Sequence, residues 1–341
     1  MGRTRDTNII CTLGPTSAKE SVLIDMARKG MSIARLNFSH GNHEGHQKMI
    51  DMIREVNDRY NFKIEILQDL EGYRIRIGHF EEPIDLVPGR IVYMSNRRRA
   101  SSRHLPFDYP GDVKHIKKGM EIFIDDGTIC LEVIGHKNDQ VQLEVRQGGL
   151  LRQRKGINIP KMKLSGSIFT QKDRNDLAFG IKNQVDYVAQ SFVRSKSDIL
   201  RIVKITSKEM PGIRVIAKIE SHEGVRNIDK IMEACDGIMV ARGDLGVSLP
   251  IYQIPVIQKY IIHRCGRKKK FVIVATQMLE SMTEHTRPTR AEVSDVANAI
   301  LDGADFVMLS GETAVGKHPV LTINMMRQVI EYTEKYENGY M

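Results

Sequence analysis

The side chains best placed to do chemistry in this sequence follow short apolar runs. Lys218 and Glu220 stand two residues apart at the end of one such run. At the end of an extended strand, residues with that spacing point the same way. A cation beside a carboxylate suits the binding of a phosphate group and a metal ion, and a structural ion pair is the simpler alternative.

A second carboxylate, Asp244, follows the next apolar run, within Gly243–Gly246. Mg²⁺ commonly takes one or two protein carboxylates and completes its shell with water and substrate phosphate. The glycines would let backbone N–H groups approach a substrate anion, although a tight turn would also need them. Glu220 and Asp244 are therefore candidate metal ligands, but a pair of carboxylates alone is a weak signal.

Other polar residues follow further apolar runs in the same way. They are Arg35, Asn37, Ser39, His40, Gln68, Asp69, Glu71, Arg74, Arg76, Thr276, Gln277, Ser310, Gly311 and Glu312. If the runs are parallel strands, these residues gather at one end of a sheet, which is where α/β barrels carry their chemistry. Such a density of charge at one mouth indicates a polar ligand.

Eight short, β-branched runs alternate with longer amphipathic stretches, which predicts a parallel sheet. The expected strands are Asn8–Cys11, Ser32–Leu36, Lys63–Leu67, Tyr187–Ala189, Val215–Ala217, Gly237–Val240, Phe271–Ala275 and Phe306–Leu309. The expected helices are Ala18–Lys29, His46–Tyr60, Lys172–Asn183, Ser195–Glu209, Gly224–Ala234, Gln253–Gly266 and Arg290–Ala304. Eight strand–helix units predict an α/β fold of the TIM (β/α)8 barrel type.

One interval, from about Ile77 to Ser165, contains no long helical pattern. Short alternating runs at Arg90–Met94, Glu121–Ile124, Ile129–Val133 and Gln140–Val145 are separated by turn residues such as Asp125-Asp126-Gly127, as in hairpins. We expect a small all-β lid domain at residues 77–165, inserted into a barrel made of residues 1–76 and 166–341. An insertion after the third strand lies at the functional end of the barrel, where it could cover a ligand.

The composition is that of an ordinary globular protein with a basic surface. The chain has 341 residues, a net charge of +9 and no Trp, which favours an anionic partner such as a phosphorylated small molecule. The basic runs Arg97–Arg99 and Arg267–Lys270 lack interleaved aromatic residues, so we expect no nucleic-acid partner. No apolar run reaches the ~18 residues of a membrane span, and four separated cysteines fit reduced thiols, so we expect a cytoplasmic protein without a membrane partner.

Eight motifs resemble those of the pyruvate kinase family and occur in the family's order. They are Cys11–Pro15, Ala34–Gly41, Lys218–Gly224, Met239–Gly246, Ala275–Glu280, Arg287–Glu292, Asp295–Ile300 and Met308–Ala314. The inserted segment, with Asp125–Gly127 and Lys155–Pro160, resembles the family's mobile B domain. The resemblance covers nearly the whole chain, which ends at Met341, before the family's usual C-terminal domain.

The resemblance implies roles at the phosphoenolpyruvate side of the site. Glu220 and Asp244 would hold Mg²⁺ or Mn²⁺, and Lys218 would neutralise the phosphoryl group in transfer. Arg35 would bind phosphate. The backbone N–H groups of Gly243 and Asp244, together with Thr276, would hold the substrate carboxylate. Ser310 and Glu312 would border the pocket, and either Thr276, through a water, or Ser310 would deliver the proton to the enolate.

The resemblance also implies a nucleotide side and a monovalent-cation site. Pro15, Asn37, His40, Arg76 and Lys172 match nucleotide-side positions. Asn37, Ser39 and Asp69 match the cation site, with Arg74 as a possible substitute for the ion. Leu70 stands where K⁺-dependent members carry a Thr ligand, and Arg74 stands where they carry Glu, so we expect that K⁺ is not required.

The implied reaction is transfer of the phosphoryl group of phosphoenolpyruvate to ADP or another nucleoside diphosphate, giving pyruvate and ATP. Gly45 in place of an expected aromatic, and the changes at Leu70, Glu71 and Arg74, leave nucleotide preference open. They also leave open the alternative that the protein is an enzyme of this type that acts on a different enolpyruvate or phosphorylated substrate. A non-catalytic binding paralogue is a third alternative. Without the C-terminal domain we expect a monomer or a barrel-to-barrel homodimer, without activation by sugar bisphosphates.

Overall fold

A computed structural model describes residues 6–96, 100–109, 111–160, 162, 168–337 and 339. The basic run Arg97–Arg99 lies outside the described residues. The chain divides into two compact units. The first comprises Met1–Gly72, Ile168–Arg242 and Gln253–Met341, and the second comprises Tyr73–Ser167 and Gly243–Tyr252.

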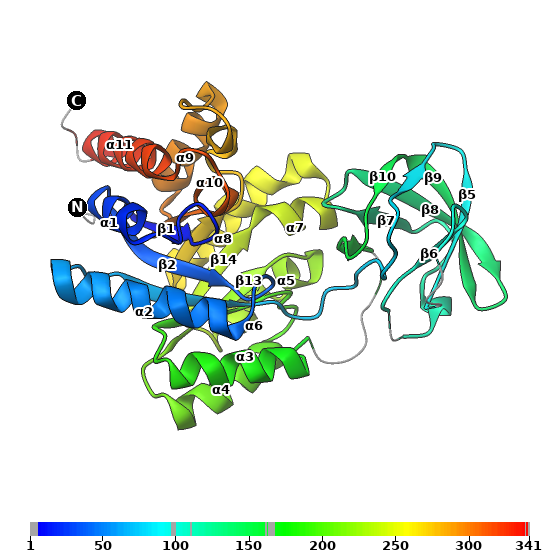
Figure 1. Ribbon diagram of the computed structural model, residues 1–341, viewed down its shortest axis with the longest axis horizontal. Helices are drawn as coiled ribbons and strands as arrows, with labels where there is room; N and C mark the ends of the chain where they lie inside the picture. Colours follow the sequence, from blue (N-terminus) through cyan, green and yellow to red (C-terminus); the bar gives the residue numbers. More distant parts are fainter. Residues whose placement is uncertain are drawn as a thin grey trace. The chain divides into compact units, whose positions relative to one another are not determined.

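The first unit is a closed barrel of eight parallel strands (Figure 1). In chain order the strands are β1 (Asn8–Thr12), β2 (Met31–Asn37), β3 (Glu65–Leu70), β12 (Tyr187–Gln190), β13 (Arg214–Ile219), β14 (Gly237–Ala241), β15 (Phe271–Ala275) and β16 (Phe306–Leu309). Strand β1 pairs with both β2 and β16, which closes the barrel. All eight expected strands are present, and the predicted TIM-type α/β fold is confirmed.

The barrel interior is packed by apolar side chains from all eight strands. They are Ile10, Ile33, Leu67, Tyr187, Ala189, Ile216, Met239, Ile273, Ala275 and Met308. Branched and long side chains fill the space that the tilted strands enclose, so the barrel is a core and not a pore. Because apolar side chains fill the interior, the polar side chains at the carboxyl ends of the strands line one mouth of the barrel.

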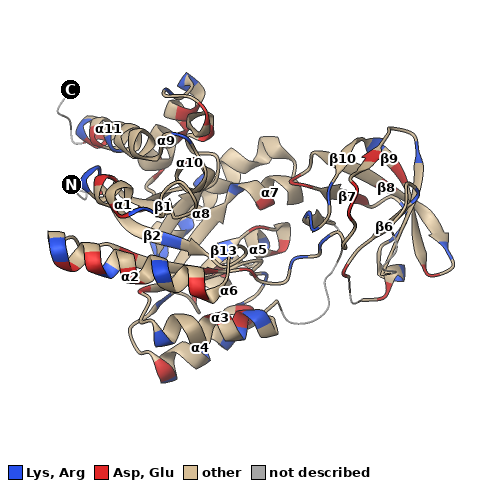
Figure 2. Cartoon of the chain, viewed as in Figure 1, with Lys and Arg blue, Asp and Glu red and all other residues tan. Residues whose placement is uncertain are grey.

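Helices surround the barrel strands, as Figure 1 shows. They are α1 (Glu20–Arg28), α2 (His43–Tyr60), α3 (Gln171–Lys182), α4 (Lys196–Glu209), α5 (His222–Arg226), α6 (Ile228–Met232), α8 (Ile254–Lys268), α9 (Arg290–Asp302), α10 (Gly311–Ala314) and α11 (Pro319–Glu337). Short 3-10 helices are η2 (Ile251–Gln253) and η3 (Glu280–Thr283). Acidic and basic residues alternate along α2 (Figure 2), which is typical of a helix face in water.

Two helices differ from the sequence prediction. The expected helix Gly224–Ala234 is divided into α5 and α6, because Asn227 between them has a backbone φ of −96° and ψ of 10°. Helix α11 follows the last strand and was not among the expected helices. It packs on α9, α10 and α1, and its buried face includes Ile323, Met326 and Ile330.

The second unit is almost entirely β-structure, as expected for the insertion. Its strands are β4 (Ile84–Leu86), β5 (Ile91–Ser95), β6 (His104–Pro106), β7 (Glu121–Ile124), β8 (Ile129–Lys137), β9 (Gln140–Gln147), β10 (Gly149–Leu151) and β11 (Ile157–Asn158). They form a six-stranded sheet, in the order β11-β7-β8-β9-β5-β6, and a two-stranded sheet of β10 and β4. Its described helices are η1 (Val113–His115), α7 (Arg242–Ser248) without its first residue, and the first two residues of η2; Arg242 and Gln253 belong to the barrel unit.

The second unit has a hydrophobic core of its own. Alternate residues of β8 and β9, such as Leu131, Val133, Val141 and Leu143, are completely buried in it. Polar residues take the intervening positions, which is the period-two pattern of a sheet with one buried face. The separate core explains why the inserted segment forms a distinct unit.

Candidate active site

A cluster of charged side chains occupies the carboxyl ends of β2, β3 and β13. Asp69 is at its centre: its Oδ1 accepts a hydrogen bond of 3.0 Å from Lys218 Nζ, and its Oδ2 accepts one of 2.8 Å from Arg35 Nε. Lys218 Nζ also lies 3.3 Å from Glu220 Oε1. The side chain of Asp69 is 1% exposed and those of Lys218 and Arg35 are about 10% exposed. The structure thus brings together four residues that the sequence predicted for the site.

The charges in this cluster hold one another in their ionised forms. Burial alone would raise the pKa of Asp69, but Lys218 and Arg35 outweigh it and lower that pKa below its usual value. Burial alone would lower the pKa of Lys218, but Asp69 and Glu220 raise it above its usual value. Lys218 therefore remains a cation at any working pH.

Two further residues fix the cluster, and sequence reasoning gave neither a role. Ser191, just after β12, accepts a hydrogen bond of 2.6 Å from Lys218 Nζ and donates one of 2.7 Å to the carbonyl of Leu70. Thr12, at the end of β1, accepts a hydrogen bond of 2.8 Å from Arg35. Both are polar residues at the carboxyl end of a barrel strand, which is the sequence signal that could have identified them.

Glu220 is buried directly after β13, with a side chain that is 2% exposed. One carboxylate oxygen accepts a hydrogen bond from the backbone N–H of Phe192, and the other faces Lys218. Phe192 has a left-handed backbone, with φ of 58°. A non-glycine residue in that region stores strain that functional sites commonly contain. The carboxylate is therefore held in one orientation from two sides.

The turn after β15 is strained and braced. Thr276 and Gln277 both have positive φ angles, 72° and 54°, which is uncommon for non-glycine residues and especially for a β-branched one. Arg242, at the end of β14, donates a 2.7 Å hydrogen bond to the Thr276 carbonyl and forms a 2.7 Å ion pair with Asp295. Arg242 lies within the Met239–Gly246 motif, and the structure shows that it positions the Thr276 turn.

Ser310 and Glu312 differ in what they can do. Glu312 is completely buried, and its carboxylate accepts hydrogen bonds from the backbone N–H groups of Met278, Leu279 and Ser310. It therefore joins the turns after β15 and β16. The hydroxyl of Ser310 is buried without a hydrogen-bond partner among the described residues. A buried, unsatisfied hydroxyl is costly, and this one suits contact with a ligand or a water.

Lys172, which the sequence predicted for the nucleotide side, lies in the first turn of α3. Lys172 Nζ donates 2.6 Å hydrogen bonds to the Phe38 carbonyl and to Asp176, and lies 3.6 Å from Glu71. Helix α3 begins at a capping box made by Thr170 and Asp173, and Asp173 also accepts a 3.0 Å hydrogen bond from Gly72 N. This bond fixes the first turn of α3, and hence Lys172, to the segment after β3.

The other predicted residues of the β1 and β2 loops are placed on the same unit. Asn37 accepts a hydrogen bond of 3.1 Å from the backbone of Ser39, and the His40 carbonyl contacts His46 Nε2 at 3.0 Å. Pro15 is exposed in the loop after β1. Asn37 is the register partner of Asp69 on the neighbouring strand. Both oxygens of the Asp69 side chain already face cationic side chains, so the predicted cation site contains positive charge from the protein itself.

Four predicted site residues belong to the second unit. Arg74 Nη2 lies 2.9 Å from Asp126 Oδ1 and 3.1 Å from Asp244 Oδ1. Arg76 donates a hydrogen bond of 3.1 Å to the Arg154 carbonyl. Gly243 and Asp244 lie in the first turn of the short helix α7, and Asp244 carries a half-buried carboxylate. The proposed ligands Glu220 and Asp244 thus come from different units.

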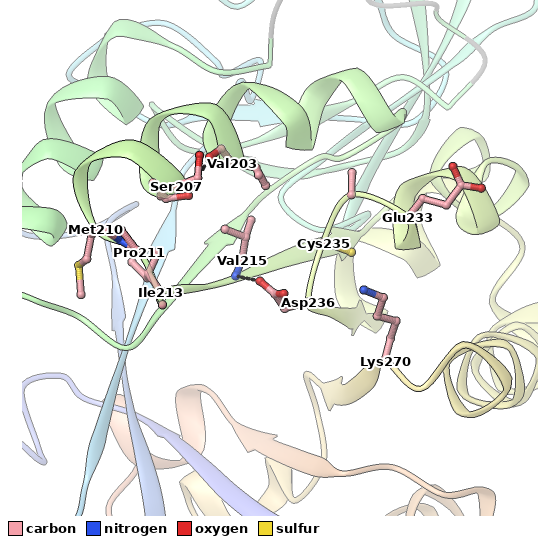
Figure 3. Close-up of a pocket in the computed structure, with 13 residues that line it drawn as sticks. Val203, Ser207, Met210, Pro211, Ile213, Val215, Glu233, Cys235, Asp236 and Lys270 are labelled. Atoms are coloured by element: carbon pink, nitrogen blue, oxygen red, sulfur yellow. Dashed lines mark hydrogen bonds between the residues drawn. The ribbon is translucent and has the colours of Figure 1, made fainter.

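A cavity of about 360 Å³ lies at the opposite ends of the barrel strands (Figure 3). It is lined by residues from the end of α4, the start of β13 and the loops before β14 and β15, including Cys235, Asp236 and Lys270. Burial raises the pKa of Cys235 to about 12, so its thiol is not reactive. The carboxylate of Asp236 accepts a hydrogen bond from Val215 N. This cavity is therefore separate from the charged cluster.

Neither a membrane-spanning helix nor a cluster of metal-ligating side chains is found among the described residues. They contain no helix with the length and apolar character that a membrane crossing requires. They also contain no group of three or more His, Cys, Asp or Glu residues arranged to hold a metal ion.

The fold and the cluster define a (β/α)8-barrel protein with buried cations at the carboxyl ends of its strands and an inserted β-domain. The family profile described as "Pyruvate kinase, barrel domain" matches residues 4–323. The pyruvate kinase of Geobacillus stearothermophilus is 45% identical over 336 residues, which are 97% of this chain and 57% of that protein. The pyruvate kinase of Staphylococcus aureus strain MRSA252 is 44% identical over 329 residues, 95% of this chain and 56% of that protein.

This chain therefore belongs to the pyruvate kinase family. It spans a little over half the length of the curated relatives that it matches. The resemblance that the eight sequence motifs predicted is confirmed.

Proposed function

We propose that this protein transfers a phosphoryl group between phosphoenolpyruvate and ADP, giving pyruvate and ATP, with a divalent metal ion. The observation that carries the proposal is the buried cluster of Lys218, Arg35, Asp69 and Glu220 at the carboxyl ends of the barrel strands. Phosphoryl transfer depends mainly on positioning and on charge stabilisation. The relatives named pyruvate kinase do not favour the alternatives of a different enolpyruvate substrate or a non-catalytic paralogue.

The two carboxylates proposed for the metal fit Mg²⁺ or Mn²⁺ by their chemistry. Both offer hard oxygen donors, and one or two carboxylates from the protein are usual for Mg²⁺. Glu220 is preorganised by Phe192 and Lys218, whereas Asp244 is half-buried beside Arg74. When bound, the ion would neutralise phosphate oxygens and stabilise the enolate oxygen.

The protein's own residues would do the following. Lys218 and Arg35 would offer positive charge to the phosphoryl oxygens, and Asp69 and Ser191 hold the Lys218 ammonium in place. Thr276, with the backbone N–H groups of Gly243 and Asp244, would orient the substrate carboxylate. Either the unsatisfied Ser310 hydroxyl or a water on Thr276 would supply the proton at carbon.

The nucleotide side is proposed to comprise Pro15, Asn37, His40, Lys172 and Arg76. Lys172 would contribute a cation from α3. Arg76 belongs to the second compact unit, which begins at Tyr73, whereas the insertion expected from sequence begins four residues later, at residue 77. We propose that this insertion, residues 77–165, acts as a mobile lid over the substrates. The barrel domain would then comprise residues 1–76 and 166–341.

We further propose that K⁺ is not required. Asn37, Ser39 and Asp69 occupy the positions that would hold the ion, and Leu70 removes an oxygen ligand. Arg35 and Lys218 already supply two positive charges to Asp69. Arg74, which the sequence suggested as the substitute cation, has its described ion pairs with Asp126 and Asp244. Arg35 and Lys218 are therefore better placed than Arg74 to supply the positive charge that K⁺ would provide.

The test is a coupled assay for pyruvate with phosphoenolpyruvate, Mg²⁺ and a panel of nucleoside diphosphates. Pyruvate should form with at least one diphosphate and should require both the metal ion and the nucleotide. Lys218→Met is the matched control, because it removes the cation and keeps a side chain of similar length. Absence of pyruvate formation with every diphosphate in a folded preparation would contradict the proposal.

A further inference from the structure

Arg74 connects two carboxylates of the second unit that are distant in sequence. Its Nη2 atom lies 2.9 Å from Asp126 Oδ1 and 3.1 Å from Asp244 Oδ1. The Arg74 side chain is 27% exposed and that of Asp244 is 23% exposed, whereas that of Asp126 is 74% exposed. The half-buried pair is therefore the one with Asp244, and the pair with Asp126 is more accessible to water.

The guanidinium has little freedom on its other side. A Cβ atom at Gly156 would lie 2.3 Å from Nε and 2.6 Å from Cζ of Arg74, so the guanidinium packs directly against the backbone at Gly156. Arg74 thus lies against the backbone before β11 and points to the carboxylates. This packing distinguishes it from a surface arginine that samples many rotamers.

The turn that carries Asp126 is strained. Asp125, Asp126 and Gly127 have successive positive φ angles of 54°, 54° and 87°. Two adjacent aspartates in this region cost free energy unless the surroundings hold them. Lys155 pairs with Asp125 at 2.8 Å and Arg74 pairs with Asp126, so ion pairs hold the turn. A Cβ at Gly127 would lie 3.9 Å from Val247 of α7, so this turn is next to the helix that carries Asp244.

We propose that Arg74 is an internal competitor of the divalent ion for Asp244 and that it gives up Asp244 and retains Asp126 when the ion binds. This inference rests on the proposed role of Asp244 as a metal ligand. A cation cannot approach the Asp244 oxygen while the guanidinium occupies it, since the two positive charges repel. Binding of the metal would therefore change how Arg74 holds the strained turn, and it would couple the ion to the conformation of the insertion.

The experiment is a Mn²⁺ titration of the whole chain, in which free Mn²⁺ is measured by electron paramagnetic resonance without substrates. Arg74→Ala should tighten Mn²⁺ binding about threefold to tenfold, since it removes a half-buried competitor. Lys155→Ala is the matched control. It also removes one positive charge that pairs with this turn, but the partner of Lys155 is Asp125 and not Asp126 or Asp244. It should change the Mn²⁺ affinity by less than about twofold.

Arg74→Lys separates a specific contact from general electrostatics. Lysine keeps the charge, but its ammonium ends one bond closer to the backbone and cannot span both carboxylates. Mn²⁺ affinity should therefore lie between those of the wild type and Arg74→Ala. Wild-type affinity in Arg74→Lys, or equal tightening in Lys155→Ala and Arg74→Ala, would overturn the proposal. Thermal melting of each variant confirms folding, and Arg74→Gln replaces the alanine variant if that protein does not fold.

Asp244→Asn separates this inference from the proposed function. It should weaken Mn²⁺ binding, and the Arg74→Ala effect should disappear in the double variant with Asp244→Asn. Unchanged Mn²⁺ binding in Asp244→Asn would remove Asp244 from the metal site and with it both proposals. Weakened binding in Asp244→Asn, with no effect of Arg74→Ala, would overturn the competition alone.

Discussion

The protein contains two sets of ion pairs, one in the barrel and one in the second unit, and the two sets differ in how far they are buried. In the barrel, Lys218, Asp69 and Glu220 are almost fully buried and have several partners each. In the second unit, Arg74 joins Asp244 to an Asp126 side chain that is 74% exposed. Removing a partner from a buried pair leaves an uncompensated charge, which is costly, whereas an exposed pair contributes little. The buried ion pairs of the barrel are therefore suited to holding catalytic side chains in place. The more accessible pairs of Arg74 are suited to the replacement of one partner by a ligand.

The largest effect is expected at the centre of the buried set. Lys218→Met should lower turnover about 10³-fold, because it removes a preorganised cation that stabilises the transition state. Pyruvate formation measured at saturating substrates, with circular dichroism as a check on folding, tests this. Turnover near the wild-type value would contradict the catalytic role of Lys218. Substrate binding should be partly retained, since Arg35 remains.

Asp69→Asn should lower the free energy of unfolding by about 3 kcal/mol, because two buried cations lose their shared carboxylate. The lowered pKa of Asp69 gives this effect a pH dependence. A carboxylate whose folded pKa is depressed stabilises the fold fully above its unfolded pKa, and that contribution is lost as the pH falls through the folded value.

The difference between wild type and Asp69→Asn, from denaturant unfolding, should thus be constant at neutral pH. It should shrink below about pH 4. The more accessible counterpart is Arg146→Gln, which removes a 47%-exposed cation from its pairs with Glu132 and Glu144 and should leave the unfolding midpoint unchanged. Equal destabilisation by both variants would show that burial does not separate the two regions.

The two proposed metal ligands should respond unequally to substitution. Glu220→Gln and Asp244→Asn should each raise the Mg²⁺ concentration needed for half-maximal activity, by about tenfold or more, since each loses a charged oxygen. Glu220→Gln should also lower turnover, because Glu220 is a partner of Lys218. An unchanged Mg²⁺ titration in either variant would exclude that residue as a ligand.

The smallest effect is expected from K⁺. Wild-type turnover in tetramethylammonium buffer should change by less than about twofold when K⁺ is added, since Asp69 already faces two cations. Arg74→Glu should be assayed in the same way. Strong stimulation of the wild type would refute the proposal, and stimulation only in the variant would assign the independence to Arg74. If neither responds, Arg35 and Lys218 are sufficient.

The sequence by itself determined the class of fold and much of the site. Period-two and period-3.6 patterns are local, so they placed all eight barrel strands, and the motifs placed Lys218, Glu220 and Arg35 at strand ends. The interval without helical periodicity predicted the β-insertion for the same reason. Helix α11 and the break at Asn227 were not predicted, because packing on neighbouring helices and local backbone angles decide such features.

Only the tertiary structure decided which side chains meet. Asp69 was expected at a monovalent-cation site, yet it also bridges Arg35 and Lys218, which come from strands 34 and 149 residues away along the chain. Ser191 and Thr12 contact Lys218 and Arg35 because the closed barrel places β12 beside β13 and β1 beside β2. Arg74 was expected to replace an ion, and the structure shows it between Asp126 and Asp244. The physical reason is that a motif fixes a residue's place on its own element, whereas its partners depend on how distant elements pack.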